Sequence, residues 1–198
     1  MCRLSDGRCA AAIGAIDAAN AADPNRVVVR GEDEPLALVH GRLASEWIIA
    51  LHPDAPDEWL IAARAHHLRR WELPRGDYPE GKAGYLRWRR DQKQRHARDV
   101  AGLLAAAGYD DDEIGRVQAL VRRDGLASGD PGAQAVEDSA CLVFIETQLA
   151  DIADRLDHDH VVDVIRKTAR KMSPEALAAA ADIPLAAAER ALLSTALS

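Results

Sequence analysis

The sequence lacks any long apolar run. No window of its 198 residues approaches the ~20 consecutive apolar residues that a membrane-spanning helix needs, and aromatic residues make up only 4% of the chain. Strand-forming sequence is equally scarce, because Val27–Val29 is the one convincing run of β-branched residues. Alanine, leucine, arginine and glutamate, which favour helices, are abundant instead. The composition therefore predicts an all-α protein without a membrane segment.

Cysteine is also scarce. The chain has three cysteines, Cys2, Cys9 and Cys141, and none of them belongs to a CxxC motif. An odd number of cysteines without paired spacing is typical of reduced thiols, so we expect a cytoplasmic protein without a thiolate metal site. Cys141 lies in the apolar run ACLVFI, where a buried and unreactive thiol is the usual role.

The length of the chain fits one domain with its own core, and no internal repeat or low-complexity linker divides it. We therefore predict a single helical-bundle domain over residues 1–198. Its N-terminal helix falls within residues 1–23, where Asp6 and Asp17 interrupt the apolar patch and favour an amphipathic helix over a signal peptide. The C-terminal helices, within residues 157–198, are expected to pack on the central part of the domain.

Apolar residues recur at helical spacing along most of the chain, and proline or glycine marks the ends of the segments. A link over residues 27–35 is expected to be strand-like at its start. After the N-terminal helix, the predicted helices cover residues 35–52, 58–72, 85–107, 111–125, 135–156 and 157–172, followed by two short alanine-rich helices.

Positive charge is concentrated between Arg64 and Arg98. This stretch has eleven Lys/Arg and four Asp/Glu in a chain whose net charge is -7, and it also holds half of the aromatic residues. Such a cationic, ring-bearing segment favours a site for an anionic, phosphorylated small molecule. A solvated face is the ordinary explanation of a charge run, and nucleic acid is a less favoured partner because the whole chain is acidic.

Within that stretch the substrate-binding candidates are Arg69, Arg75, Lys82 and Arg87. Arg75 follows a proline in an irregular loop beside a histidine pair, and it is our candidate for a direct phosphate contact. Glu72 is equally close to the pair and is a candidate general base, metal ligand or partner of a ligating histidine. Glu72 and Arg75 are therefore the predicted catalytic residues.

Successive predicted helices each offer an imidazole. The candidate ligands of a divalent metal are His40, His66, His67 and His96, together with the carboxylate of Asp138. These donors suit manganese, iron, zinc, cobalt or nickel, and the sequence leaves the choice open. Because neighbouring residues on an ideal helix point about 100° apart, His66 and His67 both serve one site only at a fraying helix end or with two metals. The competing explanations are a core role for His40, a surface position for His96 and a helix-start acid for Asp138.

The chain resembles an uncharacterised family that is known only as a domain of unknown function. The likeness spans nearly the whole chain and rests on the strings ARAHHLRRWELPRGDYPEGKAGYLRWR, RVQALVRRDGL, EDSACLVFIE and RKTARKMSP. The order of the candidate ligands also resembles that of HD-domain metal-dependent phosphohydrolases. That likeness covers residues 36–153, with LVHGRLASEWI as the first-histidine helix, AARAHHLRRW as the doublet helix and AVEDSACLVF as the last-aspartate helix. His67 stands where the HD family has the aspartate of its doublet, so the site has one negative charge fewer.

The HD-like resemblance implies a metal-dependent hydrolase of a phosphorylated or nucleotide-type small molecule, in which the metal lowers the pKa of a bound water. Two other functions remain open. Extra histidines also occur in HD-type proteins that use two irons to oxidise a substrate with O₂. A helical module that binds RNA or a nucleotide through its basic face needs no metal at all. The oligomeric state is open as well, with a homodimer as one option.

Overall fold

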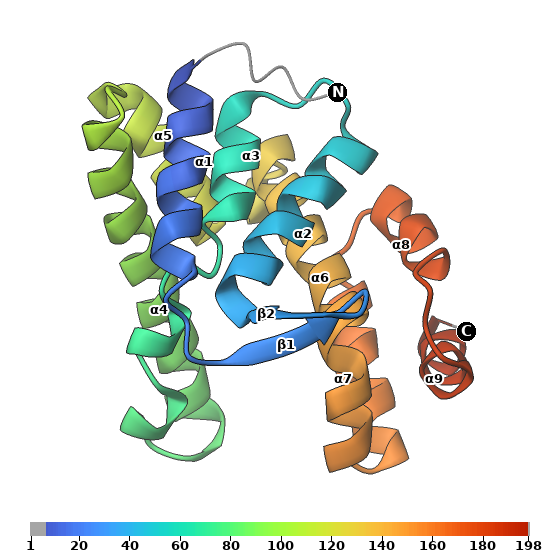
Figure 1. The fold of residues 1–198 in the computed structure, drawn as a ribbon. Helices are drawn as coiled ribbons and strands as arrows, with labels where there is room; N and C mark the ends of the chain where they lie inside the picture. The colour runs from blue at the N-terminus through green and yellow to red at the C-terminus, as the bar shows by residue number, and fades with distance from the viewer. Residues whose placement is uncertain (1–6, 198) are drawn as a thin grey trace.

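Helices account for most of residues 7–197, which are the residues that the computed structural model describes, so the predicted all-α class is confirmed (Figure 1). Short 3-10 helices η1 (Arg70–Glu72), η2 (Arg75–Asp77) and η3 (Leu126–Ser128) lie between them. No helix in the described range is long and apolar enough to cross a membrane. The α-helices are α1 (Gly7–Asn20), α2 (Leu36–Leu51), α3 (Asp57–Arg64), α4 (Gly81–Ala106), α5 (Asp111–Arg122), α6 (Pro131–Arg155), α7 (His158–Ala169), α8 (Pro174–Ala181) and α9 (Ala187–Leu197).

Several helices begin where the sequence offers a capping side chain. Asp110 and Glu113 form a capping box at the start of α5, because each side chain accepts the backbone N–H of the other residue. The carboxylates of Asp130 and Asp157 cap α6 and α7, and the hydroxyl of Ser173 caps α8. These local signals explain why α5, α7 and α8 begin close to their predicted positions. Helix α6 instead begins at Pro131, before the predicted start at residue 135.

A two-stranded hairpin precedes α2. Strand β1 (Arg26–Val29) pairs antiparallel with β2 (Glu32–Pro35), and the two turn residues, Arg30 and Gly31, have φ values of 54° and 88°. Positive φ at both turn positions suits the right-handed twist of the strands. Val27 and Val29 pack on the core beside α2, so the hairpin lies across the front of the bundle in Figure 1.

Helix α6 runs through the middle of the core. It contributes Val136 to the cluster formed with α1, α3, α4 and α5, and Val143 to the cluster formed with α2 and α3. Its second half contributes Leu142 and Leu149 to a third cluster with α7, α8 and α9. The C-terminal helices therefore pack on α6, on the right in Figure 1, and α4 and α5 lie on the left.

Helix α3 ends earlier than its sequence predicts. We expected it to reach Glu72, but regular helix stops at Arg64 and a turn follows. The ring Nδ1 of His66 lies 2.7 Å from the carbonyl oxygen of Ala63, and such a local side-chain bond competes with the helical ladder. Arg69 then adopts a left-handed conformation with φ 49°, which reverses the chain before η1.

Candidate functional site

Four histidines from three parts of the chain lie together. His40 comes from α2, His66 and His67 follow α3, and His96 lies in the middle of α4. Ring centroids are 4.1 Å apart for His66 and His67, 5.2 Å for His40 and His67, and 6.3 Å for His67 and His96. Both members of the His66–His67 pair reach one cluster because they lie beyond the regular end of α3. We refer to these four residues as the histidine cluster.

Two of the rings are held by backbone carbonyls. The Nδ1 atoms of His66 and His96 lie 2.7 Å and 2.7 Å from the carbonyl oxygens of Ala63 and Leu68. A carbonyl only accepts, so each Nδ1 carries the proton and each Nε2 carries a lone pair. Both Nε2 atoms are buried and find no hydrogen-bond partner among the described residues. Each of these two atoms can therefore still accept a hydrogen bond or bind a metal ion.

The other two rings bond to each other, with 3.0 Å between the Nδ1 atoms of His40 and His67. The hydroxyl of Thr147 donates to the carbonyl of Val143 over 2.7 Å and lies 3.1 Å from His40 Nε2. Since that hydroxyl has a single hydrogen, it accepts from His40 Nε2–H, and His40 Nδ1 accepts from His67 Nδ1–H. His67 therefore presents an Nε2 lone pair, as His66 and His96 do.

All four imidazoles are neutral near neutral pH. Burial, followed by the positive charge of Arg70, lowers the pKa of His40 to about 4 and that of His96 to about 3. Burial also lowers the pKa values of His66 and His67 well below the usual value, and nearby cations and imidazoles add to this effect.

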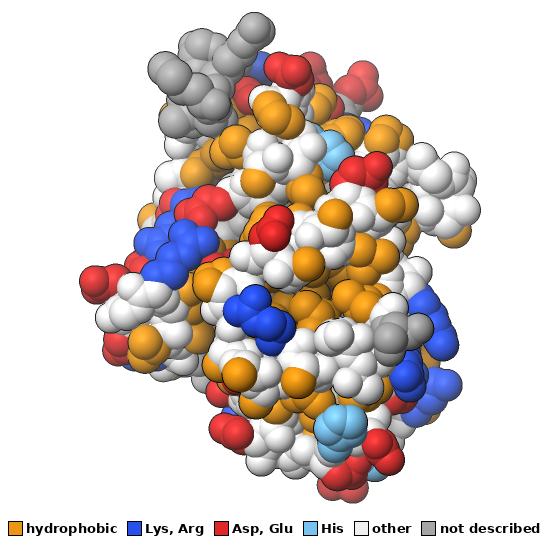
Figure 2. All heavy atoms as spheres, turned by 90° about the vertical axis from the view of Figure 1, so that its right-hand side faces the viewer, with side chains coloured by type: hydrophobic (Ala, Val, Ile, Leu, Met, Phe, Trp, Pro, Cys, Tyr) orange, Lys and Arg blue, Asp and Glu red, His pale blue; other side chains and the backbone are white. Residues whose placement is uncertain are grey.

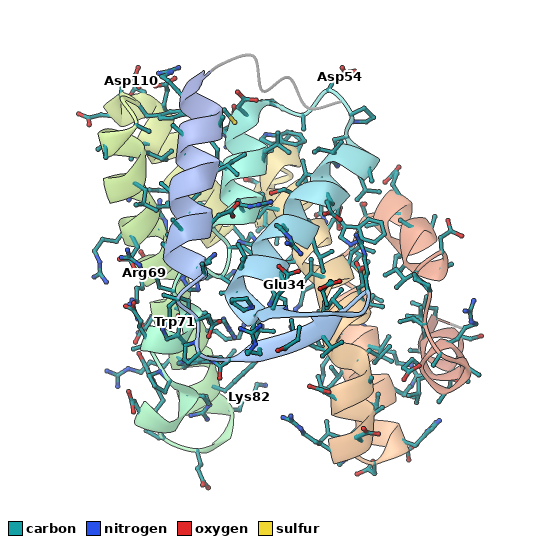
Figure 3. The ribbon with its side chains drawn as sticks, in the orientation of Figure 1. Glu34, Asp54, Arg69, Trp71, Lys82 and Asp110 are labelled. Carbon is teal, nitrogen blue, oxygen red and sulfur yellow. The ribbon has the colours of Figure 1, made fainter. Side chains whose placement is uncertain are left out.

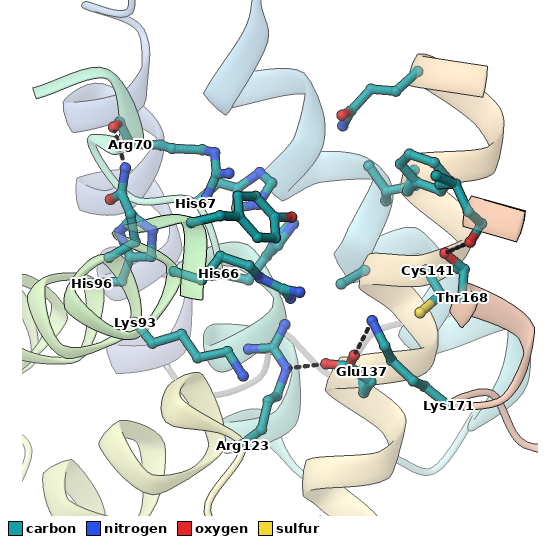
Figure 4. A pocket seen from close by; sticks show the side chains of 18 of the residues that line it. His66, His67, Arg70, Lys93, His96, Arg123, Glu137, Cys141, Thr168 and Lys171 are labelled. Atoms are coloured by element: carbon teal, nitrogen blue, oxygen red, sulfur yellow. Dashed lines mark hydrogen bonds and ion pairs between the residues drawn. The ribbon is translucent and has the colours of Figure 1, made fainter. Parts of the chain in front are cut away.

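A cavity of about 390 Å³ opens beside the histidine cluster, between α4 on one side and α6 and α7 on the other. Figure 4 shows His66, His67 and His96 at one end of this cavity and Lys171 at the other. Its charged lining consists of five cations and one carboxylate: Arg70, Arg89, Lys93, Arg123, Lys171 and Glu137. We refer to it as the cationic cavity.

Arg123 and Glu137 form a buried ion pair at the floor of the cationic cavity. The Arg123 Nε atom lies 3.2 Å from Glu137 Oε2, and the two side chains are only 7% and 9% exposed. Lys171 Nζ approaches the other carboxylate oxygen to 3.8 Å. Burial disfavours the charge on Glu137, but Arg123 and Lys171 outweigh that effect and hold its pKa below the usual value. The carboxylate therefore stays ionised and ties α6 to two cations from other elements.

The single carboxylate of Glu137 does not neutralise the three remaining cations of the cavity, Arg70, Arg89 and Lys93. Burial, and then the charge of Arg123, lowers the pKa of Lys93 to about 8. Burial is also the main reason that the pKa of Arg70 falls to about 10. Positive charges that share a partly dehydrated cavity repel one another, and an anion in the cavity would relieve that repulsion.

A second cavity of about 520 Å³ adjoins the first. His67, Arg70 and Gln148 line both cavities, and His40 lines the second. The second cavity is otherwise bounded mainly by the loop after α3 and the start of α2, and its lining is rich in apolar side chains. We refer to it as the apolar cavity.

The structure does not bring Asp138 into the histidine cluster. Its Oδ1 atom accepts hydrogen bonds from the Gln134 amide and from the backbone N–H of Ser173, both at 2.9 Å. The preceding residue, Glu137, lines the cationic cavity instead. The predicted ligand therefore serves to join α6 to the start of α8.

The two predicted catalytic residues also have other partners. Glu72 pairs with Arg95 and lines neither cavity. Arg75 lines the apolar cavity, but its guanidinium donates to the carbonyl oxygens of Tyr78 and Pro79, at 2.9 Å each. Both side chains therefore stabilise the loop before α4.

The other predicted substrate-binding residues lie outside both cavities. Lys82 (Figure 3) and Arg87 are exposed on α4. Arg87 faces Asp91 one turn further along the helix, with 3.8 Å between Arg87 Nε and Asp91 Oδ2. Arg69 is fixed through its backbone, whose N–H donates to the Asn20 amide oxygen over 3.0 Å. The cationic stretch thus divides into a solvated part and a part that faces the cavity.

The cations that line the cavity were not singled out by the sequence, except as members of charge runs. On α4 a signal does exist, because Tyr85, Arg89, Gln92, Lys93 and His96 recur at three and four and share one face of the helix. Arg123 and Lys171 follow α5 and α7, and nothing local in the sequence places them beside α4.

The donor set fits a transition metal in kind, because His66, His67 and His96 each present an imidazole Nε2 lone pair. In the arrangement of residues 7–197, however, no three or more histidine, cysteine, aspartate or glutamate side chains are grouped so that they could hold a metal ion. A metal would therefore require a rearrangement of these rings.

Comparison with known proteins places the chain in a family. The model of the family described as "Domain of unknown function (DUF4202)" matches residues 10–193. The chain belongs to this family. No curated protein and no solved structure gives a significant match to this DUF4202 chain. The prediction of an uncharacterised family is confirmed, and the likeness to HD-domain proteins stays a hypothesis.

Proposed function

We propose that this DUF4202 protein binds a phosphorylated small molecule in the cationic cavity and hydrolyses its phosphoester bond. The observation that carries the proposal is five cationic side chains and one carboxylate around a cavity that ends at neutral imidazoles. Arginine and lysine in a partly dehydrated site bind phosphate oxygens strongly. Burial is the main cause of the lowered pKa values of Lys93 and Arg70, and repulsion by neighbouring arginines adds to it. A phosphate dianion would offset both effects.

The histidine cluster supplies the acceptors that hydrolysis needs. His66 Nε2, His96 Nε2 and the Gln92 amide oxygen are buried, face no donor within the described residues and belong to side chains that line the cavity. A water molecule held there gives one proton to a neutral imidazole as its oxygen forms a bond to phosphorus. The ester P–O bond breaks, and the imidazolium returns the proton to the leaving oxygen. The cations stabilise the negative charge on the phosphoryl oxygens during this step.

We also propose an alternative in which His66, His67 and His96 hold a divalent transition metal. Their Nε2 atoms would then bind the ion instead of accepting a proton. Manganese, iron, zinc, cobalt and nickel all accept imidazole ligands, and a bound ion would supply a water of lowered pKa. His40 would orient His67 through the bond between their Nδ1 atoms.

Elemental mass spectrometry tests the metal. We expect about one equivalent in the purified wild type. His66→Ala should lose it, whereas Asp138→Asn and the exposed His158→Ala should keep it. A folded wild type that contains no metal and takes none up from manganese, iron or zinc salts would refute this part of the proposal.

Binding and turnover of simple phosphomonoesters test the function itself. We expect wild type to bind inorganic phosphate in a calorimeter and to release phosphate from at least one ester of a diverse panel. Lys171→Met should weaken phosphate binding by about tenfold, because one charge-assisted contact is worth roughly 1.4 kcal/mol or more. Lys82→Met is the matched control, since Lys82 is exposed and lines neither cavity, and its affinity should equal that of wild type. Wild type without measurable phosphate affinity would contradict the proposal.

A phosphate-binding module without catalysis is the second candidate. It is favoured by the low basicity of the cluster, since an imidazole whose pKa is about 3, as for His96, is a weak general base. Tight binding without turnover, with or without added metal, would select it. Nucleic acid is less favoured, because basic groups on the face in Figure 2 lie apart, with acidic groups among them, and the cations described above surround a cavity.

A further inference from the structure

The apolar cavity lies next to the cationic cavity and has a different chemistry. We propose that it binds the organic part of the same substrate, and that this part carries a flat apolar ring. This inference rests on the proposed function, because it assumes that the phosphate group sits in the cationic cavity. The substrate would then be a phosphate ester with a planar ring on its alcohol side.

The lining of the apolar cavity favours an apolar occupant. Its lining includes Leu36, Trp71, Leu73, Pro74 and Trp88. Apolar side chains that line a concave site gain free energy when a ligand displaces water from them.

Away from the junction with the cationic cavity, the charged groups of the same cavity are already engaged in the fold. Asp23 accepts the backbone N–H groups of Ala37 and Asn25 over 2.9 Å each, and Arg75 donates to backbone carbonyls after η2. A sugar or a peptide would need free donors and acceptors to replace its bonds to water. A ring without many polar groups has no such need, and it therefore fits this cavity better.

Trp71 offers the flat surface that a ring would use. Its indole is half-buried, and the described residues provide neither a ring contact nor a hydrogen bond for it. Trp88 differs, because its Nε1–H donates to the Leu73 carbonyl over 2.9 Å and the Arg70 guanidinium lies over its ring at 4.5 Å. Trp71 is thus the platform that remains available, on the loop between α3 and α4 in Figure 3.

The two cavities meet at residues that suit the bond between the two parts of an ester. His67, Arg70 and Gln148 line both of them. The guanidinium of Arg70 can contact a phosphate on one side while it remains stacked on Trp88. The imidazole of His67 lies at the same junction and presents an Nε2 lone pair. A ligand that spans the junction therefore places its phosphoester link beside a cation and a proton acceptor.

Calorimetric affinities for inorganic phosphate, methyl phosphate and 1-naphthyl phosphate test the inference. We expect naphthyl phosphate to bind wild type at least tenfold more tightly than methyl phosphate, since stacking and apolar burial add about 1.4 kcal/mol or more. Trp71→Ala should reduce that preference to about twofold and leave the affinity for inorganic phosphate unchanged. Trp71→Phe, which keeps a flat ring, should retain most of the preference and guards against a misfolded alanine variant.

The outcomes distinguish failure of the ring-binding inference from failure of the proposed function. Equal affinities for methyl and naphthyl phosphate would overturn the ring-binding cavity and leave the phosphate site intact. A naphthyl preference that survives Trp71→Ala in a folded protein would also overturn it, because the ring would then bind elsewhere. Failure of all three compounds to bind would instead reject the proposed function on which the inference rests.

Discussion

Lys93 illustrates how burial near other cations sets the charge of a single residue. Its pKa of about 8 results first from burial and then from Arg123, so part of its population is neutral just above physiological pH. An arginine guanidinium, in contrast, keeps its charge in that range. Lys93 is therefore the residue through which the cationic cavity responds to moderately alkaline pH.

We predict that phosphate affinity falls as pH rises above about 8, because Lys93 loses its proton and one favourable charge. Below that pH Lys93 is already protonated, so its contribution is complete there. Because bound phosphate raises the pKa of Lys93, phosphate binding above pH 8 is coupled to the uptake of up to one proton. The logarithm of the affinity therefore falls by at most one per pH unit. Calorimetric titration between pH 7 and 9.5 measures this slope.

Lys93→Arg is the matched variant for this prediction. A guanidinium stays charged throughout the range, so the decline above pH 8 should disappear while affinity at pH 7 changes little. An unchanged decline in Lys93→Arg would show that another group causes it.

The two adjacent acids of α6 show why a sequence predicts the individual residues of a site only in part. Glu137 and Asp138 are adjacent, both are buried, and the sequence marks both as acids near a helix start. Neighbouring positions point about 100° apart, so only one faces the cationic cavity. The choice depends on Ser173 and Lys171, which come from beyond α7, and no local pattern indicates them.

At the scale of elements, α4 contributes two cations and one imidazole to the lining of the cationic cavity, and its N-terminus is fixed by a close backbone approach. Gly84 packs so tightly against the loop that a Cβ atom there would overlap the Pro79 carbonyl. The next residues along this helix are Tyr85, which lines the cationic cavity, and Trp88, which lines the apolar one. The glycine therefore sets the positions of rings in both cavities.

We predict that Gly84→Ala destabilises the protein by roughly 1–3 kcal/mol, as overpacking against a backbone atom does. Gly102→Ala on the same helix should instead stabilise by about 0.5–1 kcal/mol, since alanine has the higher helix propensity and a Cβ there meets no atom within 4 Å. Urea unfolding of the two variants and wild type measures both effects. Equal stability of the two variants would contradict the close approach at residue 84.

Helix existence was largely predictable, whereas the ends that shape the site were not. Capping residues and apolar spacing gave the starts of α5, α7 and α8, because those signals are local, whereas the cap of α6 at Asp130 was missed and its start was placed at residue 135. The early end of α3 depends on the bond between the His66 ring and Ala63, and on the left-handed Arg69. Histidine and arginine are common in the last turn of a helix but do not mark its final residue, so the prediction extended the helix to Glu72, shortly before Pro74.

At the scale of the molecule, the cationic cavity lies where separate packing clusters meet. The α4 and α5 side contributes Lys93 and Arg123, and the α7 side contributes Thr168 and Lys171. The α7 helix itself packs mainly on α6 and α9. Such a meeting of distant segments depends on the whole core, which explains why the sequence predicted the histidines but none of the five cations as site residues.

This arrangement predicts that phosphate binding slows hydrogen exchange in α7. A phosphate held by Lys171 and by cations of α4 and α5 links the two sides of the cationic cavity. Local unfolding of α7 would then require release of the phosphate. With phosphate at about 100 times its dissociation constant, such opening becomes less favourable by at most ~2.7 kcal/mol, or about 100-fold in rate.

Mass-spectrometric hydrogen exchange of wild type and Lys171→Met measures this coupling. Peptides from α7 should gain protection in wild type and much less in the variant, while peptides from α1, which lies away from the cavity, should be unaffected in both. Protection confined to α4 and α5 would place the anion on one side only. In that case Lys171 would serve the Glu137 carboxylate rather than the ligand, and the link across the cavity would be wrong.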